Sequence, residues 1–191
     1  LNNKHLGTYG RFGVLSFNGN KIITTGSGGA LISKNKKDFL KIERIIYNGK
    51  EPHPYVFDHK LVGRNCSMSD LNAALGLSQI LKLKEKIKLR KKTYQKYFDY
   101  FKHSKYFEIV PLEFKTYQSN YWLSTLKLKN LPKNAKFTIL KKLNSENINA
   151  RDFWACAHKI SLYEKFGKID QLKKTFNLYN NLISLPEIYD K

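Results

Sequence analysis

The chain has 191 residues, 41% of them hydrophobic and 14% aromatic, so it can bury the core of a globular domain and is not an intrinsically disordered segment. Its 35 Lys and Arg residues against 15 Asp and Glu give a net charge of +20, which favours anionic ligands. No apolar run approaches the roughly 20 residues that span a bilayer, so the sequence predicts no transmembrane helix.

The first third of the chain predicts short strands, then a helix and a loop. Strands are expected at residues 14–17, 22–25 and 30–33, where β-branched or aromatic runs flank the Asn18-Gly19 turn and a Gly-rich turn. Apolar residues at helical spacing predict a helix over residues 36–47, which Asn48-Gly49 ends. Two prolines and a glycine then indicate a loop over residues 50–66.

A long helical pattern begins near residues 67–70 with serine cap candidates and continues to about Lys102. Its length exceeds that of an average helix, so we expect a break or kink near Lys82. One expected face is built for the close approach of another element and consists of Leu71, Ala74, Leu75 and Ser78. Further on, an apolar stripe predicts core packing and consists of Ile87, Tyr94, Tyr97, Phe98 and Phe101.

After Ser104 the pattern changes to short alternating pieces, which predict an α+β module. The expected strands are residues 107–110, 122–129 and 182–185. The expected helices are residues 137–147, 161–166 and 172–180. The long helix would then join this module to the first part of an α/β chain.

The two cysteines, Cys66 and Cys156, stand far apart without CxxC spacing. This argues against a zinc site and a disulfide scaffold, and it favours a reducing, cytoplasmic compartment. The positive charge also suggests nucleic-acid binding, with the densest basic patch at residues 82–92. Because basic residues occur in most segments and we find no zinc-finger, RNP-type or basic-zipper motif, this is the least favoured hypothesis and we expect no nucleic-acid partner.

Residues 16–29, SFNGNKIITTGSGG, place Lys21 between two turn elements. A lysine becomes a nucleophile toward carbonyls once desolvation or a cationic neighbour makes its amine partly neutral. The hydroxyl of Ser16 can bond a phosphate oxygen, and the glycines let the backbone approach a ligand closely. Lys21 is therefore a candidate catalytic residue, beside the alternative of one more solvated cation.

The segment GTYGRFGVLSFNGNKIITTGSGGALIS resembles the cofactor-lysine region of the DegT/StrS family of pyridoxal-phosphate-dependent sugar aminotransferases. The resemblance implies that Lys21 bonds covalently to the aldehyde of pyridoxal 5'-phosphate. It also implies that Ser16 contacts the cofactor phosphate. A lysine at this place speaks against the dehydratase branch of the family, in which a histidine stands here.

A second segment, VGRNCSMSDLNAALGLSQI at residues 62–80, is similar to the family's Gly-x-Asn-Tyr-Arg-Met segment. There an asparagine reaches across a homodimer interface to the cofactor phosphate of the partner. The resemblance implies this role for Asn65, and it implies a homodimer. Cys66 and Ser67 stand where the family usually has tyrosine and arginine.

Two further stretches, SNYW at residues 119–122 and ARDFW at residues 150–154, also resemble family segments. With Pro52-His53 and Asp58-His59, they resemble most the branch that acts on UDP-linked 4-keto-6-deoxy amino sugars of the bacillosamine and legionaminic acid type. The implied substrate-binding residues are His53, Tyr121, Arg151 and Trp154. Core packing is the alternative for the aromatics, and an inert surface position is the alternative for His53.

The resemblance covers nearly the whole chain but only the second half of the family's length, and the chain, which starts at Leu1, is expected to be part of something longer. It implies a partial fold-type-I, aspartate-aminotransferase-like large domain, a connecting helix and a small α+β domain. The corresponding ranges are residues 1–66, 67–104 and 105–191.

The implied function is transfer of an amino group from glutamate to C4 of a nucleotide-linked 4-keto-6-deoxy sugar, in polysaccharide biosynthesis. In longer family members, three cofactor-binding elements precede the position of Leu1: a Gly-Thr segment that cradles the phosphate, an aromatic that stacks on the ring, and an aspartate that pairs with the pyridine nitrogen. The isolated chain is therefore expected to bind the cofactor weakly and not to turn over. A truncated, non-catalytic remnant of the family is the second hypothesis.

Overall fold

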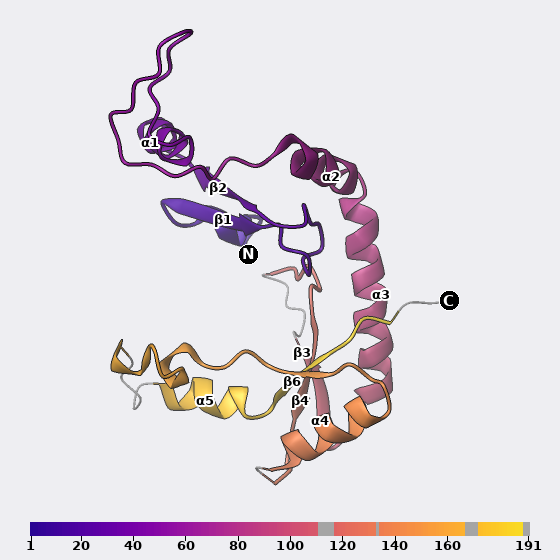
Figure 1. Ribbon diagram of the computed structural model, residues 1–191. Helices are drawn as coiled ribbons and strands as arrows, with labels where there is room; N and C mark the ends of the chain where they lie inside the picture. The colour runs from indigo at the N-terminus through magenta and orange to yellow at the C-terminus, as the bar shows by residue number, and fades with distance from the viewer. Residues whose placement is uncertain (111–116, 133, 167–171, 189–191) are drawn as a thin grey trace. The chain divides into compact units, whose positions relative to one another are not determined.

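The computed structural model describes residues 1–110, 117–132, 134–166 and 172–188 (Figure 1). The chain divides into two compact units. Unit 1 comprises residues 1–86 with residues 117–118, and unit 2 comprises the other described residues from Ile87 onward. Within these described ranges, no helix has both the length and the apolar character needed to cross a membrane. The three domain ranges expected from the sequence stay a prediction.

Unit 1 contains a two-stranded antiparallel sheet (Figure 1). In its register Ser16 lies opposite Gly29. A Cβ at Gly29 would lie 2.4 Å from the carbonyl oxygen of Leu15, so this close strand pairing requires glycine. The elements of unit 1 are η1 (Leu6–Thr8), β1 (Phe12–Ser16), β2 (Gly29–Ser33), α1 (Lys36–Ile46), α2 (Asp70–Ile80) and the start of α3 (Leu83–Phe101).

The strand expected at residues 22–25 is wrong. β1 pairs directly with β2, and residues 17–28 form the loop between them, which we call the lysine loop. Thr25 N–H donates to the carbonyl of Phe17 at 3.0 Å, and the Thr24 hydroxyl donates to the same carbonyl at 2.9 Å. The β-branched residues therefore fold the loop onto itself, because these local bonds replace those of a strand ladder.

Helix α1 confirms the helix expected at residues 36–47, and its ends explain why. The side-chain oxygen of Asn35 accepts the backbone N–H groups of Lys37 and Asp38, which caps the first turn. At the other end Asn48 and Gly49 take φ angles of 62° and 73°, the left-handed conformation that ends a helix. The chain then runs through the loop expected at residues 50–66.

The break expected near Lys82 is confirmed. Helix α2 ends at Ile80 and α3 begins at Leu83, and the N–H of Lys82 donates to the carbonyl of Gln79 at 3.0 Å. Of the serine cap candidates, Ser69 is the N-cap of α2, since its hydroxyl accepts the N–H of Asn72 at 3.3 Å. Two helices therefore replace one continuous rod.

Unit 2 is built on a four-stranded antiparallel sheet in the order β3-β4-β6-β5. Its elements, besides the rest of α3, are β3 (Phe107–Val110), β4 (Ser124–Leu128), α4 (Ala135–Ser145), β5 (Arg151–Asp152), η2 (Ala157–Lys159), η3 (Glu164–Phe166), α5 (Lys173–Tyr179) and β6 (Leu182–Leu185). All three expected strands are present. The helix expected at residues 161–166 is only the short 3-10 turn η3, and the two-residue strand β5 has no counterpart among the predictions.

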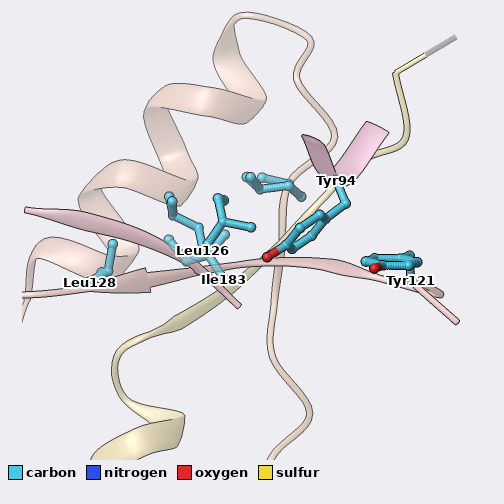
Figure 2. Packing of buried hydrophobic residues seen from close by; sticks show 8 residues of the cluster. Tyr94, Tyr121, Leu126, Leu128 and Ile183 are labelled. Carbon is cyan, nitrogen blue, oxygen red and sulfur yellow. The ribbon is translucent and has the colours of Figure 1, made fainter. Parts of the chain in front are cut away.

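The core of unit 2 lies on this sheet (Figure 2). Ile109, Leu126 and Ile183 occupy one line across β3, β4 and β6, and each is at most 2% exposed. Tyr94 of α3 is buried with them, and Tyr97, Phe98 and Phe101 pack against this cluster, so the core prediction is confirmed for these four residues of the stripe. Ile87, the first residue of the stripe, is half-buried and does not belong to the cluster. Burial of these apolar side chains supplies the main driving force for folding of the unit.

We expect Tyr97 to make the stability of unit 2 sensitive to alkaline pH. Its hydroxyl donates to the carbonyl of Pro186 at 2.9 Å, and burial raises the pKa of the phenol. A pKa raised by folding means that the stabilisation is complete below the unfolded-state pKa of about 10 and is lost as pH rises through the higher folded-state pKa. We expect the melting temperature to fall less steeply above about pH 10 in Tyr97→Phe than in the wild type. If the melting temperatures of the two proteins fell in parallel with pH, Tyr97 would not be the source of the alkaline sensitivity.

Candidate active site

Lys21 lies in the lysine loop, after the turn at Asn18-Gly19. Its backbone N–H donates to the carbonyl of Asn18 at 3.0 Å, which closes that turn, and the residue is half-buried. The two ends of the loop meet where the N–H of Phe17 donates to the carbonyl of Gly28 at 3.0 Å. Gly26 and Gly28 have φ angles of 81° and 100°, a conformation that L side chains rarely adopt. The lysine is therefore carried by a loop with a defined path.

Ser16 is the last residue of β1 and is exposed. Its hydroxyl oxygen accepts the N–H of Asn18 in a long hydrogen bond of 3.5 Å, which places the hydroxyl at the entry of the lysine loop. The structure thus puts Ser16 and Lys21, two predicted cofactor-binding residues, at one end of the same small sheet. A hydroxyl and a primary amine are the groups that a phosphate and an aldehyde require.

Helix α2 holds the far side of the lysine loop. The N–H of Thr24 donates to the side-chain oxygen of Gln79 at 3.2 Å, and the side-chain amide of Asn72 donates to the carbonyl of Thr25. Thr25 is only 3% exposed, and a Cβ at Gly76 would lie 2.7 Å from its methyl group. These contacts join residues that lie 47 and 55 positions apart in the sequence.

The face of α2 that another element approaches differs from the expected one. Leu71, Ala74, Leu75 and Ser78 are exposed in the structure. The lysine loop instead packs on Asn72, Gly76 and Gln79, which are spaced i, i+4, i+7 and therefore share one side of the helix. The sequence contains this signal as a stripe of polar and small residues on a helix rich in leucine and alanine.

Asn65 and His53 lie elsewhere in unit 1. Asn65 is exposed, forms an isolated bridge with Tyr47 just after α1, and its side-chain oxygen accepts the hydroxyl of Ser67 at 2.9 Å. His53 is exposed in the loop after α1, where its Nδ1 accepts the N–H of Val56 at 2.9 Å. That bond orders the loop locally, so His53 has a structural role whether or not it also contacts a substrate.

The other three predicted residues belong to unit 2. Tyr121 is 3% exposed, has a φ of 54°, and its ring centroid lies 5.1 Å from that of Tyr94 in the core (Figure 2). Arg151 is exposed on β5, and Trp154 is 55% exposed with its ring centroid 5.5 Å from that of Trp122. The core-packing alternative therefore describes Tyr121, whereas Arg151 and Trp154 present their side chains at a surface.

Comparison with known proteins identifies the family. Residues 1–190 match the DegT/DnrJ/EryC1/StrS aminotransferase family. The chain belongs to this family. A DegT/DnrJ/EryC1/StrS relative, the putative pyridoxal phosphate-dependent aminotransferase EpsN of Bacillus subtilis, is 35% identical over 161 residues, which are 84% of this chain and 40% of that protein. The UDP-4-amino-4,6-dideoxy-N-acetyl-beta-L-altrosamine transaminase of Helicobacter pylori is 28% identical over 193 residues, which are 96% of this chain and 49% of that one.

Solved structures of aminotransferases have the same fold. Helicobacter pylori PseC, an aminotransferase involved in the biosynthesis of pseudoaminic acid, aligns with a TM-score of 0.88 and 26% identity over 98% of this chain and 50% of that chain. The aminotransferase TlmJ from Streptoalloteichus hindustanus aligns with a TM-score of 0.90 at 20% identity, over all of this chain and 51% of its own. The chain is thus an α/β member of the DegT/DnrJ/EryC1/StrS family that spans about half the length of the relatives it matches.

Proposed function

We propose that the protein is a pyridoxal-phosphate-dependent aminotransferase that acts on a nucleotide-linked 4-keto-6-deoxy sugar. The observation that carries the proposal is the placement of Ser16, at the end of β1, beside the lysine loop that carries Lys21 and that α2 holds, within a chain of this family. Relatives named as transaminases of UDP-linked amino sugars support the substrate class.

The residues of the lysine loop and of the strand ends beside it fit the cofactor. Lys21 supplies the primary amine that an aldehyde needs, and Ser16 supplies an exposed hydroxyl donor for a phosphate oxygen. A Cβ at Gly28 would lie 3.3 Å from the terminal methyl group of Met68, and the strand pairing at Gly29 leaves no room for a side chain, so these glycines hold the path of the chain beside Lys21. When bound, pyridoxal phosphate supplies an electron sink for the carbon that loses a proton.

In this proposal Lys21 has two tasks. Its Nζ holds the cofactor covalently and, once released, takes the proton from the α-carbon of the amino donor, proposed to be glutamate. For the second half of the reaction, the same nitrogen returns a proton to C4 of the sugar. Ser16 holds the phosphate, and Asn65 contacts the phosphate bound by the second copy in a proposed homodimer.

The proposed substrate contacts come from exposed side chains. Trp154, paired with Trp122, offers an aromatic face to a sugar ring or a base. Arg151 offers its guanidinium to the diphosphate or to the donor carboxylate, both of which it can bind in a bidentate manner. The proposals for His53 and for the buried Tyr121 rest on the family resemblance alone. The excess of positive charge favours capture of a nucleotide diphosphate.

The organisation of the whole protein is part of the proposal. We place a cofactor-binding large domain at residues 1–66, a connecting helix at residues 67–104 and a small domain at residues 105–191. A cytoplasmic location is proposed from the two cysteines, one exposed and one buried, neither of which forms a disulfide.

The proposal is tested with the protein expressed from its complete gene. Supplied with pyridoxal phosphate, glutamate and a UDP-linked 4-keto-6-deoxy-N-acetylhexosamine, it is expected to form the 4-amino sugar, detected by mass, together with one equivalent of 2-oxoglutarate. Omission of glutamate is the control and should abolish the product. No product from this sugar or its GDP-linked counterpart, with no adduct at Lys21, would leave the non-catalytic remnant as the better reading. Tight, salt-sensitive binding of DNA or RNA would favour the third hypothesis.

A further inference from the structure

The lysine loop presents two backbone groups to α2. Phe17 O already accepts the N–H of Thr25 and the hydroxyl of Thr24, so these bonds close the loop on its inner side. The N–H of Thr24 and the carbonyl of Thr25 face outward and are paired by Gln79 and Asn72. Because Thr25 is buried, an unpaired carbonyl there would be costly, so these side chains are needed to keep the loop in place.

We propose that Asn72, Gly76 and Gln79 of α2 are positioning residues for Lys21. Asn72 and Gln79 fix the peptide groups three and four residues after the lysine, and Gly76 lets the methyl group of Thr25 approach the helix. A lysine has a long stem with many rotamers, so the position of its amine depends on how firmly its backbone is held. The inference deepens the proposed function and rests on it.

The orientation of the Asn72 amide is itself fixed. The hydroxyl of Ser69 donates to the side-chain oxygen of Asn72, which leaves the NH₂ group directed at the carbonyl of Thr25. Ser69 also accepts the N–H of Asn72 as the N-cap of α2. The start of the helix and the lysine loop are therefore joined by one hydrogen-bonded chain, Ser69–Asn72–Thr25.

Two variants of the protein expressed from its complete gene test this inference, and two more serve as controls. Asn72→Asp replaces the donor with a carboxylate that cannot donate to Thr25, and Gln79→Leu removes the acceptor of the Thr24 N–H. Gln79→Glu keeps an acceptor oxygen and should behave as the wild type. Gln95→Leu is the matched control, because Gln95 is an exposed glutamine on α3 that bonds to Asp99.

Two measurements are made on each protein. Hydrogen exchange of the amides in residues 17–29 is expected to accelerate about two- to tenfold in Asn72→Asp and Gln79→Leu, the range set by the net strength of one hydrogen bond. Exchange should stay unchanged in Gln79→Glu and Gln95→Leu. The rate at which borohydride traps added pyridoxal phosphate on Lys21 should fall in the same two variants only.

The outcomes separate the two proposals. If the wild type traps no pyridoxal phosphate on Lys21, the proposed function fails, while loop docking by α2 is still decided by the exchange. Unchanged exchange in Asn72→Asp and Gln79→Leu would overturn the docking. Faster exchange with unchanged trapping, in a wild type that does trap the cofactor, would show that α2 stabilises the loop without positioning the lysine.

Discussion

In the protein expressed from its complete gene, replacement of Lys21 by alanine is expected to abolish covalent capture of pyridoxal phosphate and to lower amino transfer by roughly 10³-fold or more. The side chain is proposed both to bond the cofactor and to move protons, so a single change removes both contributions. Capture is measured by the absorbance at the edge of the visible range and, after borohydride reduction, by the mass of the peptide that contains residue 21.

Two further variants make this result specific. Lys21→Arg keeps the positive charge, but its guanidinium stays protonated and is a poor nucleophile, so it should fail as completely as alanine. Lys41→Ala removes an exposed lysine of α1 and should leave both capture and turnover unchanged. A reducible cofactor band that persists in Lys21→Ala would show that the covalent site is a different lysine and would end the assignment.

Much of the fold could be predicted because its causes are local. Helix α1 follows from an asparagine cap, an apolar stripe and an Asn-Gly stop within a short stretch of sequence. The strands β3, β4 and β6 likewise follow from short apolar or alternating stretches, whose deciding residues lie within a few positions of one another. The break between α2 and α3 follows from the length of the helical pattern.

The predictions are wrong where residues distant in the sequence determine the local structure. Residues 22–25 have strand composition, but the carbonyl of Phe17 and the side chains of α2 take up their hydrogen bonds. The packing face of α2 is not predicted for the same reason, since Asn72 and Gln79 form hydrogen bonds with a loop about 50 positions earlier in the sequence. A propensity scale contains no information about such partners.

The residues of the candidate site also differ in how far a local motif predicts their position. Lys21 and Ser16 are predicted from the sequence because their spacing and the flanking residues form one continuous motif, and their roles stay a prediction. Arg151 and Trp154 share a short segment, and the structure exposes both. The place of Tyr121 does not follow from its motif, because an aromatic residue there is equally suited to the core, and only its contact with Tyr94 reveals where it lies.

The largest expected change in stability comes from Asp152→Asn. Lys136 of α4 has a side chain that is only 3% exposed, and its ammonium pairs with Asp152, donates to the carbonyl of Tyr179 at 2.8 Å and lies 3.9 Å from the centroid of that ring. The Tyr179 hydroxyl donates to Asp152 at 2.9 Å. Burial of the Tyr179 phenol, and to a lesser extent this hydrogen bond, raises the pKa of Tyr179. Asp152 therefore neutralises a buried cation and accepts two donors.

Loss of the carboxylate leaves that cation without a counter-charge, and removal of one partner of a buried pair costs about 3 kcal/mol. The reverse change, Lys136→Met, should cost less, roughly 1 kcal/mol, because methionine fills the site and the carboxylate left behind is one-third exposed to water. Urea unfolding followed by tryptophan fluorescence measures both, since Trp122 and Trp154, the two tryptophans of the chain, belong to unit 2.

Helix α4 offers the matched control for this comparison. Lys142 pairs with Glu146 at its end, but both side chains are more than half exposed. An exposed i,i+4 pair contributes only about 0.3–0.5 kcal/mol, so Glu146→Gln should barely shift the unfolding midpoint. The order of destabilisation is thus Asp152→Asn first, Lys136→Met second and Glu146→Gln last. If Lys136→Met proved more harmful than Asp152→Asn, the ammonium would be held mainly by the Tyr179 carbonyl and ring, and burial of an unpaired charge would not be the dominant cost.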